Sequence, residues 1–200
     1  RVLTDVIWNA PNLLTLLRIV LIPIFIVAYH LPLAWAPLLA TGLFVLAALT
    51  DWLDGYLARR LKQASAFGAF LDPVADKLMV ASALVLLASD TRILARVWDH
   101  RLFAVVVLII LGREIAVSAL REWMAELGKR ASVAVSVVGK FKTIGQMLAI
   151  PFLLYQQPLL GVPVFAIGEI LLYLAAGLTL WSMAVYLKAA WPDLVRPRGP

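Results

Sequence analysis

Long apolar stretches follow one another along almost the whole chain, and few charged residues interrupt them. A helix needs about 20 mostly apolar residues to cross a bilayer. The segments that qualify are 11–29, 37–58, 72–89, 102–120, 141–157 and 163–187. The preceding segment, 1–10, mixes apolar and polar side chains as interfacial helices do. The pattern therefore predicts an all-α, polytopic membrane protein with six transmembrane helices and a short N-terminal interfacial helix.

Composition strengthens this interpretation. Of the 200 residues, 63% are hydrophobic and 15% are charged, whereas soluble domains have about 45–50% apolar and about 25% charged residues. Such a chain cannot cover itself with a water-facing surface, so lipid is the expected solvent. The chain shows no internal repeat, low-complexity tract or linker, so we expect a single domain over 1–200.

The positive charges predict the orientation in the membrane. With six spans and both ends in the cytoplasm, Arg92, Arg96 and Arg101 are the only basic residues, of 18, that fall outside. Connections rich in Lys and Arg face the cytoplasm. The net charge of +6 therefore lies mainly on one face, where it suits anionic lipids and phosphate-bearing substrates rather than nucleic acid.

Four aspartates stand out in this apolar chain: Asp51, Asp54, Asp72 and Asp76. Each residue turns a helix by about 100°, so the first two share one helix face. The last two are one turn apart on the next predicted helix. A short connection makes these two helices antiparallel neighbours, so the two acidic faces are expected to meet near the cytoplasmic surface.

Four carboxylates within a membrane repel each other and need a positive partner. Oxygen ligands without His or Cys favour Mg²⁺, Mn²⁺ or Ca²⁺ over zinc, and two such ions would balance four carboxylates and clamp a diphosphate. The small residues Gly55, Ala58 and Gly68 leave room there for a base or a ribose, and Arg59 can neutralise a phosphate. Taken singly, these aspartates could be helix caps and these glycines packing residues, but capping does not require two acids on each of two facing helices.

A second polar group lies later in the chain. Arg113 and Glu114 interrupt the fourth span, and Arg121, Lys140 and Lys142 follow near its end and at the start of the fifth. These cations can bind an acceptor that carries its own phosphate. Alternatively, the two lysines extend to lipid headgroups and Arg113 pairs with Glu114. A further set could line the pocket or serve only helix entry: Asn12, Thr15 and Arg18, with Thr143 as another candidate lining residue.

The aspartates belong to the pattern Asp-x2-Asp-Gly-x2-Ala-Arg-x8-Gly-x3-Asp-x3-Asp, filled at every position between Asp51 and Asp76. In this the chain resembles the CDP-alcohol phosphotransferases. The resemblance implies six transmembrane helices, a homodimer and a cytoplasm-facing site with two divalent cations, Mg²⁺ or Mn²⁺. It also implies that all four aspartates are metal ligands and that Asp76 is in addition the base that deprotonates the acceptor. The residues implied to contact CDP are Gly55, Ala58, Arg59 and Gly68.

The resemblance extends beyond this pattern, to the segments 11–18, 67–77, 113–115, 119–126, 139–143 and 191–194. These segments are similar to bacterial members that use glycerol 3-phosphate as the acceptor. The resemblance therefore implies an inner-membrane enzyme that transfers the phosphatidyl group of CDP-diacylglycerol to glycerol 3-phosphate and releases CMP. Under this expectation the acceptor phosphate is bound among Arg113, Arg121, Lys140 and Lys142.

Other functions remain open from the sequence. A sister enzyme would use inositol, inositol phosphate or serine as the acceptor. A divalent-cation transporter would use the aspartates as an ion site, but it would need acids along a path across the membrane. Here the acids gather on the cytoplasmic side, next to an arginine and three small residues, which favours the transferase.

Overall fold

The computed structural model describes residues 10–61, 66–126 and 137–194. Every regular element within these ranges is a helix, so the all-α prediction is confirmed. The predicted interfacial helix lies outside these ranges except for its last residue. The helices are α2 (Ala10–Tyr29), α3 (Ala36–Leu61), α4 (Ala66–Ser89), α5 (Thr91–Leu94), α6 (His100–Glu126), α7 (Val137–Tyr155) and α8 (Val164–Leu194).

Each predicted span coincides with one of the long helices. Four of them are long and apolar enough to cross a membrane by length and composition: α2, α3, α6 and α8. Several such helices in one chain indicate a multi-pass membrane protein. The other two long helices, α4 and α7, carry polar residues of the predicted site, including Asp72, Asp76, Lys140 and Lys142, and these lower the mean hydropathy of both helices.

The predicted connection over 59–71 is wrong at both ends. Helix α3 continues to Leu61 and α4 begins at Ala66. Pro73 lies inside α4, where it removes one helical hydrogen bond without ending the helix. Arg59 and Gly68 therefore belong to helices rather than to a loop. The same holds for Arg121 and Lys140, because α6 extends to Glu126 and α7 begins at Val137.

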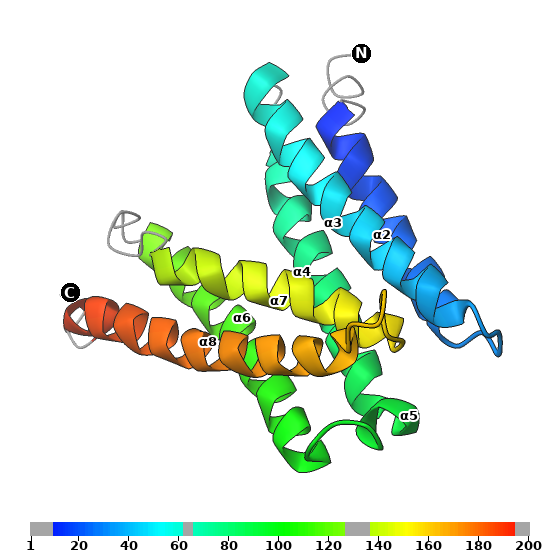
Figure 1. Ribbon diagram of the computed structural model, residues 1–200. Coiled ribbons are helices and arrows are strands. Elements are labelled where there is room, and N and C mark those ends of the chain that lie inside the picture. Colours follow the sequence, from blue (N-terminus) through cyan, green and yellow to red (C-terminus); the bar gives the residue numbers. More distant parts are fainter. Residues whose placement is uncertain (1–9, 62–65, 127–136, 195–200) are drawn as a thin grey trace.

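The helices form two groups. Helix α2 packs against α3 and α4, while α8 packs against α6 and α7. The groups contact each other through α3 with α7 and through α4 with α6 and α7. Figure 1 shows the start of α2, the end of α3 and the start of α4 together at the top of the view, and the end of α6, the start of α7 and the end of α8 together at the left.

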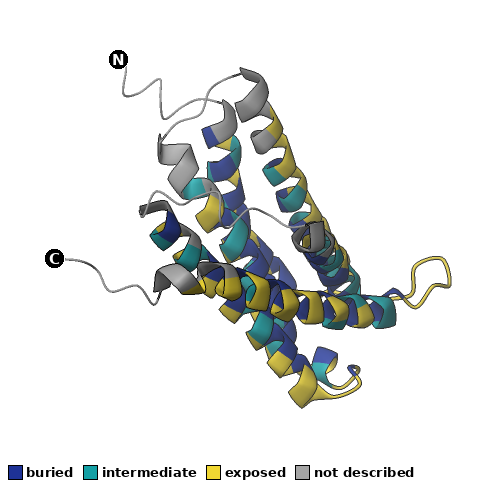
Figure 2. Ribbon diagram, turned by 90° about the vertical axis from the view of Figure 1, so that its left-hand side faces the viewer, coloured by how far each residue is buried: buried dark blue, intermediate teal, exposed yellow. Residues whose placement is uncertain are grey.

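Apolar side chains fill the interior and also cover the outside. The core includes fully buried residues from both groups, such as Phe25, Phe44, Leu84, Phe103 and Leu153. Figure 2 shows exposed residues along the outward faces of the helices and buried residues where the helices meet. On α2 alone the exposed residues include Leu13, Leu17, Val20, Ile24 and Val27. Large exposed apolar surfaces of this kind are stable when lipid covers them.

A buried carboxylate ties the segment before α6 to α8. Glu169 accepts hydrogen bonds from the backbone N–H of Trp98 (2.9 Å) and from the hydroxyl of Tyr173 (2.7 Å). Nearby, the guanidinium of Arg96 lies 4.2 Å from the centre of the Phe165 ring, a favourable cation–π distance. These contacts hold the second helix group together at the end away from the chain termini.

The α7–α8 contact generates a stability prediction. A Cβ at Gly168 would lie 2.8 Å from Cβ of Phe152 and 3.0 Å from the carbonyl oxygen of Ala149, so the two helices would have to move apart. We expect Gly168→Ala to lower the free energy of unfolding by about 1–3 kcal/mol, measured as a lower midpoint of thermal unfolding in detergent. Gly177→Ala in the same helix is the control because nothing lies within 4 Å of its Cβ position. Equal midpoints for the two variants would contradict this packing.

Candidate active site

The first predicted aspartate pairs with the polar stripe on α2. Asn12, Thr15 and Arg18 are all buried, although the stripe faces an otherwise apolar core. Nη1 of Arg18 lies 2.8 Å from Oδ1 of Asp51. The guanidinium is 1% exposed and the Asp51 side chain 38% exposed, so the arginine supports the carboxylate from inside while the acid remains accessible. Arg18 thus contacts one of the four predicted aspartates, and the role of the stripe in the site stays a prediction.

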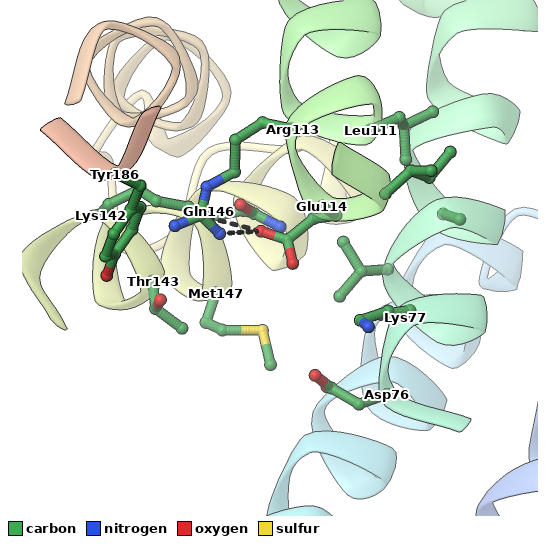
Figure 3. Close-up of a pocket in the computed structure, with 13 residues that line it drawn as sticks. Asp76, Lys77, Leu111, Arg113, Glu114, Lys142, Thr143, Gln146, Met147 and Tyr186 are labelled. Atoms are coloured by element: carbon green, nitrogen blue, oxygen red, sulfur yellow. Dashed lines mark hydrogen bonds and ion pairs between the residues drawn. The ribbon is translucent and has the colours of Figure 1, made fainter. Parts of the chain in front are cut away.

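A cavity of about 370 Å³ opens between α4, α6, α7 and α8. Figure 3 shows Asp76 and Lys77 on one side and Arg113, Glu114 and Lys142 on the other. A smaller hollow is lined by both Asp76 and Arg18, so Asp76 borders both the cavity and a space that it shares with the partner of Asp51. The remaining lining residues are Val80, Ala81, Leu111, Ile115, Thr143, Gln146, Met147 and Tyr186.

The basic side of the cavity is organised by one carboxylate oxygen. Oε1 of Glu114 accepts hydrogen bonds from Nη1 of Arg113 (2.9 Å) and from Nζ of Lys142 (2.5 Å). Arg113 is 7% exposed and Lys142 is 2% exposed. Lys142 therefore points inward rather than toward lipid headgroups. Arg113 both pairs with Glu114 and lines the cavity, so the two interpretations of this residue are compatible.

Two lining groups were not predicted from the sequence. Nζ of Lys77 donates to Oγ of Ser118 on α6, and Oγ of Ser118 donates to the carbonyl oxygen of Glu114 (2.7 Å). The sequence contained a sign of this role, because Lys77 directly follows the predicted site residue Asp76. Gln146 is buried one turn after Lys142 on α7, a spacing that places both on one face.

Several predicted site residues have side chains outside the described part of the structure. The backbone places Asp54, Gly55, Ala58 and Arg59 on α3, Gly68 and Asp72 on α4, Arg121 on α6 and Lys140 on α7. Among the described side chains no group of three or more His, Cys, Asp or Glu residues could hold a metal. Only Asp51 and Asp76 of the four aspartates are described, so a four-carboxylate site stays a prediction.

The described residues are compatible with a divalent cation beside the cavity. Asp76 lines a hollow together with Arg18, and Arg18 pairs with Asp51, so the two described carboxylates approach the same guanidinium. Carboxylate oxygens are ligands suited to Mg²⁺ and Mn²⁺. Across the cavity, Asp76 of α4 thus faces a basic side formed by Arg113 of α6 and Lys142 of α7.

Comparison with known proteins identifies the family of this chain. The CDP-alcohol phosphatidyltransferase profile matches residues 8–181. A Pectobacterium atrosepticum protein named CDP-diacylglycerol–glycerol-3-phosphate 3-phosphatidyltransferase is 55% identical over 190 residues, which cover 95% of this chain and 99% of that protein. A protein of the same name from Yersinia enterocolitica is 53% identical, over 94% of this chain and 98% of its own length. Another from Sodalis glossinidius is 55% identical, over 93% of this chain and 97% of its own length. The chain belongs to the CDP-alcohol phosphatidyltransferase family.

Proposed function

We propose that this protein transfers the phosphatidyl group of CDP-diacylglycerol to glycerol 3-phosphate, forming phosphatidylglycerophosphate and CMP. The relatives carry the name of this reaction and match over nearly their full length. The structural observation that supports it is a cavity in which Asp76 faces the buried cations Arg113 and Lys142. Such a cavity can hold an acceptor by its phosphate while presenting its hydroxyl to a carboxylate.

The basic region suits an acceptor with its own phosphate. A phosphate ester carries about −1.5 to −2 charges at neutral pH, and Lys77, Arg113 and Lys142 all line the cavity. A neutral polyol or a zwitterionic amino acid would bring no net negative charge to balance the excess of cations over Glu114 on this side of the cavity. Arg121 and Lys140 lie on the same two helices, α6 and α7, and we include them in the proposed phosphate site.

The acidic region would hold the metal. The proposed ligands of two divalent cations, Mg²⁺ or Mn²⁺, are Asp51, Asp54, Asp72 and Asp76. The residues proposed to contact CDP are Gly55, Ala58, Arg59 and Gly68. When bound, the cations would supply positive charge that neutralises the diphosphate and the departing phosphate. Nη1 of Arg18 lies 2.8 Å from Oδ1 of Asp51, and this contact would help to orient the carboxylate toward a metal.

The protein's residues then act in a simple order. Lys142, Arg113 and their neighbours bind the acceptor phosphate and orient the acceptor's free primary hydroxyl toward Asp76. Asp76 accepts the hydroxyl proton as the oxygen attacks the phosphorus that bears diacylglycerol. A new phosphorus–oxygen bond forms, the bond from that phosphorus to CMP breaks, and CMP leaves with the bonding electrons.

The same proposal includes the placement in the membrane. Six crossings, with α4 and α7 shielded by their neighbours, would return both chain ends to one side. Helix α7 packs against α8, α3 and α4, and α4 packs against α2, α3, α6 and α7, so polar residues on these two helices can face protein rather than lipid. We propose a homodimeric protein of the bacterial inner membrane, with the short interfacial helix at its N-terminus and the active site facing the cytoplasm.

The acceptor assignment can be tested by comparing acceptors in one assay of CMP release. With CDP-diacylglycerol and Mg²⁺ or Mn²⁺, we expect release with glycerol 3-phosphate and little with inositol, inositol phosphate or serine. Lys142→Met should raise the KM for glycerol 3-phosphate about 10–100-fold, since a hydrogen bond to a charged group contributes about 1.5–3 kcal/mol. Release that is equally fast with serine or inositol would reject glycerol 3-phosphate as the specific acceptor.

The metal and base assignments predict a separate result. Asp76→Asn should lower kcat by about 10²–10⁴-fold, the usual contribution of a general base, and Asp54→Asn should strongly reduce activity at every acceptor concentration.

Removing divalent cations with a chelator should abolish CMP release, and Mg²⁺ or Mn²⁺ should restore it. Asp99→Asn is the matched control because Asp99 lies in the connection before α6, far along the chain from the aspartate motif. Full activity of Asp54→Asn would contradict its role as a ligand.

A further inference from the structure

Glu114 is the one charged group described in the cavity wall to which the proposed mechanism gives no task. Its carboxylate faces the cavity, between the two cations of the basic side and Asp76 (Figure 3). We infer that Glu114 is a positioning residue, which keeps Lys142 and Arg113 charged and directed at the acceptor phosphate and so makes the site selective for phosphorylated acceptors. This inference rests on the proposed function.

The geometry assigns both cations to one oxygen atom. Oε1 of Glu114 lies 2.5 Å from Nζ of Lys142 and 2.9 Å from Nη1 of Arg113. These residues come from α7 and α6, so the carboxylate fixes the distance between cationic groups of two helices. Lysine and arginine carry three and five N–H donors, more than the one that each gives to Oε1 of Glu114. Both side chains line the cavity, so an acceptor phosphate can approach them while Glu114 stays in place.

Burial makes the carboxylate necessary. Lys142 and Arg113 are 2% and 7% exposed, and a buried charge without a partner is strongly unfavourable. Among the described residues, the buried Nε of Arg113 has no hydrogen-bond partner, so this guanidinium already has unused donor capacity. Without Glu114, both cations would lose the anion that they share, and their side chains would move to find water or another carboxylate.

The charges that line the cavity favour an anionic acceptor. Lys77, Arg113 and Lys142 contribute three positive charges, and Asp76 and Glu114 contribute two negative charges, which leaves an excess of one positive charge. A phosphate monoester carries about −1.5 to −2 charges and can balance this excess. A neutral acceptor cannot, so the charges of the cavity favour a phosphorylated acceptor.

The third cation is held by the same stretch of α6. Ser118 lies one turn after Glu114, receives a hydrogen bond from Lys77 of α4, and donates to the carbonyl oxygen of Glu114. One turn of α6 therefore orients cations that come from α4, α6 and α7. This common support explains how side chains from three helices can converge on one phosphate with little reorganisation.

Steady-state kinetics of CMP release with the full-length protein tests the inference. For Glu114→Gln we expect the KM for glycerol 3-phosphate to rise by about tenfold or more, the KM for CDP-diacylglycerol to stay within about twofold, and kcat at saturating acceptor to change little. Glu114→Asp keeps the charge and should show a smaller rise. Glu122→Gln is the matched control, since Glu122 is exposed on the same helix and does not line the cavity.

A double-mutant cycle separates positioning from a general structural effect. If Glu114 acts through Lys142, then Glu114→Gln in a Lys142→Met background should raise the KM for glycerol 3-phosphate much less than it does alone. If Glu114→Gln cannot be purified in folded form, the smaller change of Glu114→Asp and its coupling to Lys142→Met provide the same test.

Three results would overturn the inference: an unchanged or lower KM for glycerol 3-phosphate, an equal rise in both KM values, or additive effects in the cycle. The assay of the wild-type protein tests the proposed function separately from the role of Glu114. A wild-type protein that releases CMP only with another acceptor would overturn the proposed function. A wild-type protein that uses glycerol 3-phosphate, together with a kinetically unaltered Glu114→Gln, would overturn only the role of Glu114.

Discussion

The need to pair charges in an apolar environment constrains this whole structure. A charged residue near the centre of a bilayer costs at least about 2.5–3.5 kcal/mol, so buried cations must meet anions of neighbouring helices. Arg18 on α2 meets Asp51 on α3, and Lys142 on α7 meets Glu114 on α6. Each pair fixes how its two helices lie relative to each other, because sliding either helix by one turn would separate the charges. Apolar packing alone, which is much less directional, would allow several such arrangements.

The two charge pairs also divide the chemistry of the site. The Arg18–Asp51 pair lies in the group of α2, α3 and α4, and the Lys142–Glu114 pair lies in the group of α6, α7 and α8. Asp76 and Lys77 on α4 face the second group across the cavity. Under the proposed function this separation is a requirement. An acceptor with a phosphate at one end and a reacting hydroxyl at the other needs the phosphate-binding cations and the reacting carboxylate, Asp76, at different places in the cavity wall.

Much of the fold and part of the site could be predicted from the sequence. Apolar runs predicted a helix at each of six places, because helix length in a membrane follows from composition. The helix ends were less predictable: polar residues such as Arg59 and Gly68 resemble a loop, although the helical backbone continues through them. The inward position of Lys142 was open from one sequence, since a lysine near a helix end can extend to headgroups or pair inside. That choice depends on Glu114, which is 28 residues away in the chain and adjacent only once the helices pack.

The mixed lining of the cavity follows from the kind of substrate that it would accept. Besides its charged residues, the wall contains Val80, Leu111 and Met147, and it includes Ile115, which is 71% exposed on the outer face of α6. The apolar wall is thus continuous with the surface that lipid would cover. A lipid substrate could keep its acyl chains in the bilayer and insert only its phosphates into the cavity. The charged pairs of the cavity wall would then not have to separate in contact with acyl chains. A closed polar pocket would instead require the chains to enter protein, where the core is already filled by side chains.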